Sequence, residues 1–156
     1  MNQAVNHTTF TIERDLPGSP RHAFRFWSEA ELKRKWNSCH VDWTELDERF
    51  EFRRGGEEMA LWRMPDEREL GFRAHYFEIV PSARIVYAYE MTLDGASVST
   101  SLVTIEFQAR GRETRMTFTE QAAFLDGSDP ATRKLGTEDG FERLIAVMEL
   151  DGAVQH

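Results

Sequence analysis

The sequence predicts an α+β domain in which a curved antiparallel sheet packs against a long C-terminal helix. Residues 72–125 contain successive alternating segments, each closed by turn residues, and a helical pattern follows them. In that pattern Phe141, Leu144 and Met148 fall at i, i+3 and i+7, the spacing of an amphipathic helix. Because an apolar helix laid into a curved sheet encloses space, the first question about function is what that space holds.

The beginning of the chain predicts one strand followed by two short helices. Residues 8–16 alternate between apolar and polar side chains, which is the period of a strand with one buried face. Ser19 followed by Pro20 fits the N-cap and the first position of a helix. Ser28 with Glu31 forms a capping-box pattern, so a second short helix is expected to begin after Ser28.

Six more strands and a final helix are expected after these. The strands are predicted at residues 41–52, 58–64, 70–79, 84–92, 98–109 and 113–121. Asp129 fits the N-cap of a helix over residues 131–151. The order β-α-α-β-β-β-β-β-β-α makes one domain over residues 1–156, with residues 1–7 as a disordered tail.

Charge, hydropathy and cysteine content exclude several classes of function. The 156 residues carry a formal net charge of −8, which disfavours binding to the phosphates of nucleic acids. The sequence has no apolar run of about 18 residues, so we expect no membrane span. Cys39 is the single cysteine, which rules out an internal disulfide and fits a reducing cytoplasm. The histidines form no zinc-binding spacing and no nucleotide-binding loop occurs, so we expect neither metal nor cofactor.

Five stretches of the chain carry a resemblance to a known family. They are, in order, FTIERDLPGSPRHAFRFWSEAELKRKW, FEFRRGG, FEIVPSARIVYAYEM, TFTEQAAFLDG and GTEDGFERL. On these stretches the chain resembles the SRPBCC, or START-like, superfamily, in the branch named after the activator of the heat-shock chaperone ATPase. The resemblance implies the helix-grip fold, with two small helices closing one end and a cavity between the sheet and the long helix. Proteins of this superfamily bind lipids and hydrophobic metabolites, and some are cyclases.

Two departures from the pattern of these relatives bear on the cavity. Many relatives carry Gly-Trp early in the last helix, where this chain has Gly136-Thr137, and many place an aromatic residue where this chain has Glu58. Gly136 and Gly140 each cost about 1 kcal/mol relative to alanine in a helix, so a reason for them is expected. They leave room for a ligand, or they allow either close packing of the helix on the sheet or a distorted first turn, and we favour this structural explanation.

Strand phase places charged side chains on the inner face of the predicted sheet. Glu120 lies in phase with Phe118, so we expect it inside, where a carboxylate is desolvated as in a general acid or base. Arg14 lies in phase with Ile12 and is the expected partner of Glu58 or Glu120. A structural pair and a pair that binds a polar ligand group both stay open, and we favour the structural pair.

These patterns, with the resemblance, predict a small, mostly hydrophobic ligand in the cavity between the sheet and the C-terminal helix. Aromatic and aliphatic walls would enclose the ligand, and a few polar groups, tyrosine hydroxyls among them, would fix its orientation. The expected ligand contacts are Arg14, Trp36, Glu58, Tyr76, Tyr87, Glu120, Gly140 and Leu144.

Two alternative functions stay open. By resemblance, the domain is a chaperone co-factor that touches and stimulates an ATPase, which needs a binding surface rather than a cavity. The second alternative is an enzyme such as a cyclase or isomerase that uses Glu58 or Glu120, although we expect binding without catalysis. A filled core with an exposed apolar patch favours a protein partner, and a void favours a ligand. Free sheet edges also leave a homodimer open.

Overall fold

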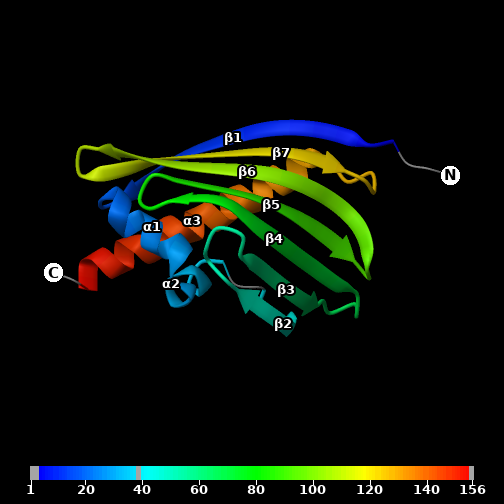
Figure 1. Cartoon of the computed structure of the whole chain (residues 1–156). Helices are drawn as coiled ribbons and strands as arrows, with labels where there is room; N and C mark the ends of the chain where they lie inside the picture. Colours follow the sequence, from blue (N-terminus) through cyan, green and yellow to red (C-terminus); the bar gives the residue numbers. More distant parts are fainter. Residues whose placement is uncertain (1–3, 38–39, 155–156) are drawn as a thin grey trace.

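One seven-stranded antiparallel sheet and three helices make up the residues that the structure describes, which are 4–37 and 40–154 (Figure 1). The structure is a computed structural model of the chain. The strands are β1 (Asn6–Pro17), β2 (Thr44–Phe50), β3 (Glu57–Arg63), β4 (Glu69–Val80), β5 (Arg84–Leu93), β6 (Ala96–Arg110) and β7 (Glu113–Phe124). The helices are α1 (Pro20–Ser28), α2 (Ala30–Arg34) and α3 (Pro130–Val154). The strand order is β1-β7-β6-β5-β4-β3-β2, so β1 and β2 form the two edges.

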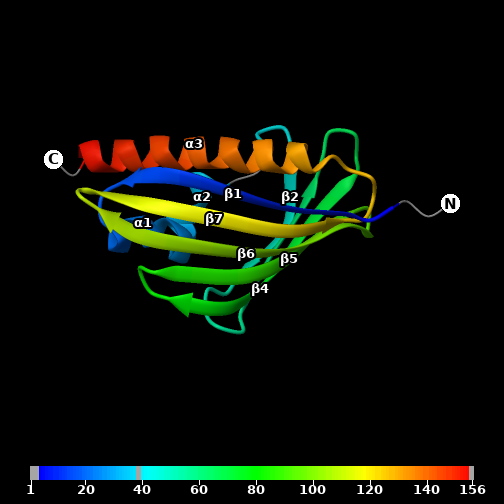
Figure 2. The same ribbon diagram turned by 90° about the horizontal axis from the view of Figure 1, so that it is seen from above.

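This arrangement confirms the predicted α+β helix-grip fold. Helix α3 crosses the concave side of the curved sheet, and α1 and α2 lie at one end (Figure 1). Seen from above, α3 runs along β1, which is its main packing partner in the sheet (Figure 2). We expected residues 1–7 to be a tail, but β1 begins at Asn6, which pairs with Phe124. That boundary was therefore wrong for Asn6 and His7, and residues 1–3 lie outside the described part of the chain.

Two of the three helix starts follow the predicted caps. The Ser19 side chain accepts a hydrogen bond from the backbone N–H of His22 at 3.2 Å, and Pro20 opens α1. The Asp129 carboxylate accepts one from the backbone N–H of Ala131 at 3.0 Å. The capping box expected at Ser28 was wrong, because Ser28 is the last residue of α1 and α2 begins without a side-chain cap. A single residue separates the two helices, which leaves no room for a separate cap.

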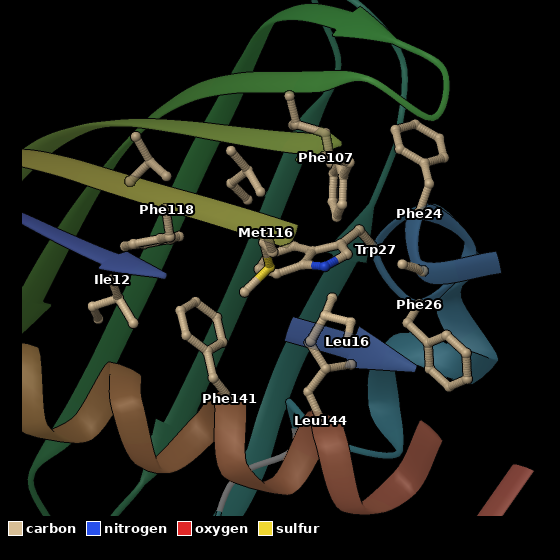
Figure 3. Packing of buried hydrophobic residues seen from close by; sticks show 14 of the residues in the cluster. Ile12, Leu16, Phe24, Phe26, Trp27, Phe107, Met116, Phe118, Phe141 and Leu144 are labelled. Atoms are coloured by element: carbon tan, nitrogen blue, oxygen red, sulfur yellow. The ribbon is translucent and has the colours of Figure 1, made fainter. Parts of the chain in front are cut away.

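The C-terminal half of α3 fills the interior with its apolar face (Figure 3). Phe141, Leu144 and Met148 are at most 2% exposed. The ring of Phe141 meets the ring of Phe118 edge-on, with centroids 5.1 Å apart. The space beneath this half of α3 is therefore packed solid, and Leu144, an expected ligand contact, is a core residue.

Aromatic side chains also join α1 and the segment after α2 to the core. The rings of Trp27 and Trp36 lie 4.7 Å apart at their centroids, and Phe141 lies within 6.3 Å of both. The Trp36 indole N–H donates a hydrogen bond to the backbone carbonyl of Phe26 at 2.9 Å. Trp36, also an expected ligand contact, is thus a buried residue whose polar atom is already satisfied.

The inner face of β3, β4 and β5 is covered less completely than that of β1 and β7. The register places Ala60, Phe72 and Met91 side by side across these three strands, on the inner face. All three residues are half-buried, and so is Trp62. Apolar surface therefore remains accessible on the concave side, away from the part that α3 fills.

Candidate functional site

A cavity of about 220 Å³ lies between α2 and strands β2 to β4. Its apolar wall includes Phe50, Ala60, Trp62 and Phe72, all half-buried. We expected the hollow beneath α3, whereas this cavity lies beneath α2. The bulky face of α3 fills the interior near β1, whereas α2 has only five residues and places the small side chain of Ala30 at the cavity wall.

Charged side chains form the outer part of the cavity. Arg34 and Asn37 come from the α2 side, and Glu45, Glu48 and Arg49 come from β2; all five are exposed. Arg34 forms an ion pair with Glu48. The cavity thus has an apolar interior and a polar rim, which is the usual division of a small-molecule site.

Lys33, Glu58 and Tyr76 form the polar cluster beside the apolar wall. The Lys33 Nζ and the Tyr76 hydroxyl both donate to Glu58 Oε1, each at 2.5 Å. The Lys33 and Glu58 side chains are only 12% and 14% exposed. Burial, and after it the carboxylate of Glu58, raises the pKa of Tyr76 far above its usual range, so this hydroxyl stays protonated and donates.

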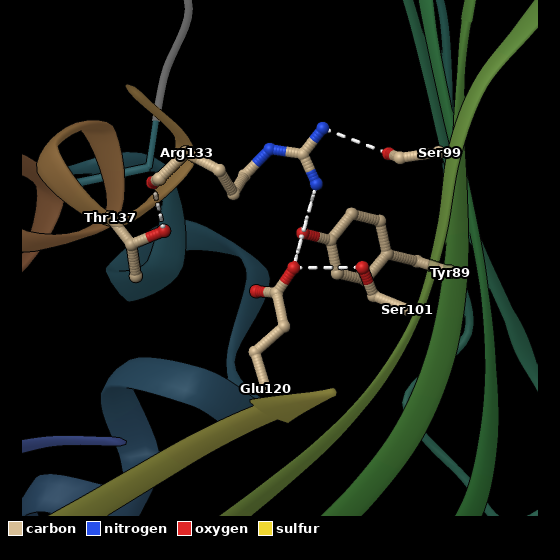
Figure 4. A network of polar contacts seen from close by, with 6 residues as sticks. All are labelled: Tyr89, Ser99, Ser101, Glu120, Arg133 and Thr137. Atoms are coloured by element: carbon tan, nitrogen blue, oxygen red, sulfur yellow. Dashed lines mark hydrogen bonds and ion pairs between the residues drawn. The ribbon is translucent and has the colours of Figure 1, made fainter. Parts of the chain in front are cut away.

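A second polar network surrounds Glu120 on β7 (Figure 4). Glu120 is 1% exposed, which confirms the inward position predicted from strand phase. The hydroxyls of Tyr89 and Ser101 donate to its Oε2 atom, each at 2.7 Å. Arg133 of α3 lies 3.5 Å from the same oxygen and donates to the Tyr89 hydroxyl at 2.8 Å. Burial, and after it Glu120, raises the pKa of Tyr89 above its usual range.

Arg133 was missed by the sequence reasoning. Its guanidinium also donates to the Ser99 hydroxyl at 2.8 Å, so it ties α3 to both β5 and β6. The sequence did indicate the inward position of Arg133, because this residue lies eight residues before Phe141 and so shares the apolar face of α3. Reading that face towards the start of the helix would have placed a cation inside the domain.

Arg14 does not join either network. We expected it to pair with Glu58 or Glu120, and that was wrong. Its guanidinium instead lies 3.3 Å from Glu138 and 3.1 Å from Glu142, both on α3, and its side chain is 25% exposed. Because β1 is an edge strand that runs beside α3, the helix carboxylates reach Arg14 before any carboxylate of the inner sheet.

Neither glycine of α3 is explained by close packing, which corrects that part of the interpretation that we favoured. A methyl group added at the exposed Gly136 would meet no atom within 4 Å. At the buried Gly140 the nearest atom would be a guanidinium nitrogen of Arg143, 3.7 Å away, which is an ordinary contact. A methyl group would therefore fit at Gly140 without displacing a described neighbour.

The described part of the chain contains neither a cluster of metal ligands nor a membrane-spanning helix. No three histidine, cysteine, aspartate or glutamate side chains in that part of the chain gather closely enough to hold a metal ion. Cys39, the single cysteine, lies outside the described residues. None of the helices in that part is long and apolar enough to cross a bilayer.

A curved antiparallel sheet that grips a long C-terminal helix places the protein in the class of helix-grip proteins. A family model described as "Activator of Hsp90 ATPase homolog 1-like protein" matches residues 17–151. The chain therefore belongs to this family, which confirms the resemblance seen in its sequence.

Solved structures agree with this assignment. A putative uncharacterized protein from Rhizobium leguminosarum is 44% identical, with a TM-score of 0.88 over 94% of this chain and 97% of the other. Mll3558 from Rhizobium loti is 37% identical, with a TM-score of 0.85 over 93% and 99%. An AHSA1-like protein from Aeromonas hydrophila, 16% identical, shares the fold, with a TM-score of 0.70 over 93% and 94%. A search among curated proteins found no match.

Proposed function

We propose that the protein binds a small, mostly apolar molecule in the cavity between α2 and strands β2 to β4. The observation that carries the proposal is this hollow of about 220 Å³, which has an apolar wall and includes Lys33 and Glu58 in its lining. Ligand sites in proteins combine these features, a mostly apolar lining and a few fixed polar groups that orient the ligand.

The volume of the cavity limits the size of the ligand. An apolar cavity of about 150 Å³ is large enough to hold benzene. A cavity of about 220 Å³ therefore suits a molecule of roughly one or two rings, rather than a long lipid chain.

The energetics of the Lys33–Glu58 pair also favour a role in binding. Both side chains are largely removed from water. Their desolvation costs several kcal/mol, and the attraction between the two charges must offset this cost. Apolar side chains of similar volume usually stabilise a fold as well or better. Stability alone therefore does not explain the pair, whereas a fixed polar group beside an apolar cavity would orient a ligand.

The alternative functions have weaker support. The carboxylates of Glu58 and Glu120, which an enzyme would use as acid or base, are both engaged by a cation and by hydroxyl donors. A chaperone co-factor would need a contiguous exposed apolar surface. The large exposed apolar side chains of the described residues are instead distributed over several strands, the loops and α3, with Leu46, Phe77, Leu102 and Leu135 as examples.

A pair of alanine substitutions tests the proposal. Ala60 lines the cavity on β3, whereas Ala88 on β5 is also half-buried but points to the outer face. The test ligand comes from a panel of small apolar compounds. When it is present at about 100 times its Kd, the wild type and Ala88→Leu should melt about 5–10 °C higher. Ala60→Leu places three more carbon atoms in the cavity, which leaves too little room for the ligand, and should lose this shift. A shift retained by Ala60→Leu, or a wild type whose melting temperature is unchanged by a panel of apolar one- and two-ring compounds, would contradict the proposal.

A further inference from the structure

The three tyrosines on the inner face differ in what their hydroxyls contact. Tyr87 lies between the other two, with ring centroids 5.8 Å from Tyr76 and 6.0 Å from Tyr89. Those two neighbours donate their hydroxyl hydrogens to Glu58 and Glu120 respectively. The Tyr87 hydroxyl makes no hydrogen bond to any residue that the structure describes.

The Tyr87 hydroxyl is nevertheless not sealed inside the protein. Among the described residues, the one side-chain polar atom that is both closed off from solvent and without a partner is the indole nitrogen of Trp27. The Tyr87 oxygen must therefore retain accessible surface. Its side chain is half-buried and points to the concave side, since the register aligns it with the buried Tyr76 and Val103. An unpartnered hydroxyl thus lies on the concave side, beside Tyr76, whose own hydroxyl donates to the cavity residue Glu58.

The charges on both sides of Tyr87 already cancel. Glu58 pairs with Lys33 at 2.5 Å, and Glu120 pairs with Arg133 at 3.5 Å. A charged ligand group placed between these pairs would have no free counter-ion, and burying an unpaired charge is costly. Burial, Tyr89 and the two carboxylates raise the pKa of Tyr87 well above its usual range, so the hydroxyl stays protonated.

We propose that the ligand is an electrically neutral molecule with an apolar body, and that its carbonyl or ether oxygen accepts a hydrogen bond from Tyr87. This inference rests on the proposed function, because it assigns the chemical class of the ligand of the same interior. The apolar body would lie against Phe72, which lines the cavity and whose ring centroid is 5.2 Å from that of Tyr89. Tyr87 would then distinguish between ligands of equal size by the acceptor that they carry.

Four compounds of one shape test this inference by isothermal titration calorimetry. They are 2-acetylnaphthalene, 2-ethylnaphthalene, 2-naphthoate and 1-(2-naphthyl)ethylamine, which present a neutral acceptor, no polar group, an anion and a cation. In the wild type the ketone should bind most tightly. In Tyr87→Phe the ketone should bind about five- to tenfold more weakly, as expected for one neutral hydrogen bond. The hydrocarbon should bind equally to both proteins.

Thermal unfolding of the free variant supplies the folding control. Tyr87→Phe should melt within about 2 °C of the wild type, because the hydroxyl that it removes has no partner among the described residues. Equal binding of the ketone to both proteins, or tighter binding of the anion or the cation, would overturn the inference. The hydrocarbon would then still bind, so the proposed function would stand. If none of the four compounds binds the wild type, the proposed function fails, and this inference fails with it.

Discussion

Arg133 of α3 lies 3.5 Å from Glu120 of β7, a carboxylate that is 1% exposed (Figure 4). The pair joins the beginning of the long helix to the inner face of β7 by a polar contact. The C-terminal half of the same helix is held by apolar packing instead, through Phe141, Leu144 and Met148. The two halves of α3 should therefore respond differently to substitution.

Removing Arg133 should destabilise the fold strongly. Arg133→Met leaves Glu120 buried without its cation, which costs about 3–5 kcal/mol in the free energy of unfolding, measured with urea. Arg133→Met combined with Glu120→Leu should lose less than Arg133→Met alone, because no uncompensated charge remains. Arg14→Met is the matched control: its partners Glu138 and Glu142 are 31% and 64% exposed and stay in contact with water, so it should cost less than about 1 kcal/mol. Equal losses from the two arginine substitutions would contradict this account.

Tyrosine ionisation should limit stability at high pH. The chain has three tyrosines, and the pKa of each is raised in the folded protein. Below the unfolded-state pKa of about 10 both states are protonated, so stability is unaffected there. Above about pH 10 the unfolded chain ionises and the folded one does not, so stability falls by up to roughly 1.4 kcal/mol per pH unit for each tyrosine.

Urea unfolding between pH 8 and pH 11.5 measures this fall, and absorbance at 295 nm reports tyrosinate directly. Tyr87→Phe removes one of the three groups and should reduce the slope above pH 10 by about a third. Tyrosinate absorbance that rises near pH 10 while the protein is still folded would argue against the enclosed positions of these rings.

Replacing a phenylalanine by alanine should affect stability differently in the tightly packed core and at the cavity wall. Phe141 is 2% exposed and packs against Phe118, so Phe141→Ala should cost about 3–5 kcal/mol. Phe72 is half-buried at the cavity wall, so Phe72→Ala should cost clearly less, because less apolar area leaves water at that position. Ligand binding should follow the opposite order and be lost in Phe72→Ala. Urea unfolding and calorimetry measure the two effects, and equal stability losses would show that the cavity wall is packed as tightly as the core.

The two glycines of α3 should each be replaceable. Alanine at Gly136 or Gly140 meets no close neighbour among the described residues, so each change should stabilise the protein by about 1 kcal/mol through helix propensity. The exposed Gly136 is the control for the buried Gly140, which we proposed as a ligand contact. Weaker ligand binding in Gly140→Ala alone would support that contact, and unchanged binding would remove it. A Gly140→Ala variant that is less stable than the wild type would contradict this prediction, because it would require close contact between the helix and the sheet at Gly140.

The sequence determined the order of the elements and the face on which most side chains lie. Period-two alternation on β7 placed Glu120 inside, and the spacing of Phe141, Leu144 and Met148 placed α3 against the sheet. These features are local, because the repeat of a strand or helix decides which residues share a face. The family pattern, read from the same residues, supplied the helix-grip architecture.

Only the tertiary structure decided which inward side chains meet and where the interior stays hollow. Arg14 pairs with Glu138 and Glu142 because α3 lies along the edge strand β1, and Glu120 receives Arg133 instead. The cavity lies under α2 because the bulky half of α3 fills the other end. Alternation fixes the face of a side chain but not the curvature of the sheet or the position of the helix across it. Those depend on contacts between residues far apart in the chain, which local periodicity does not encode.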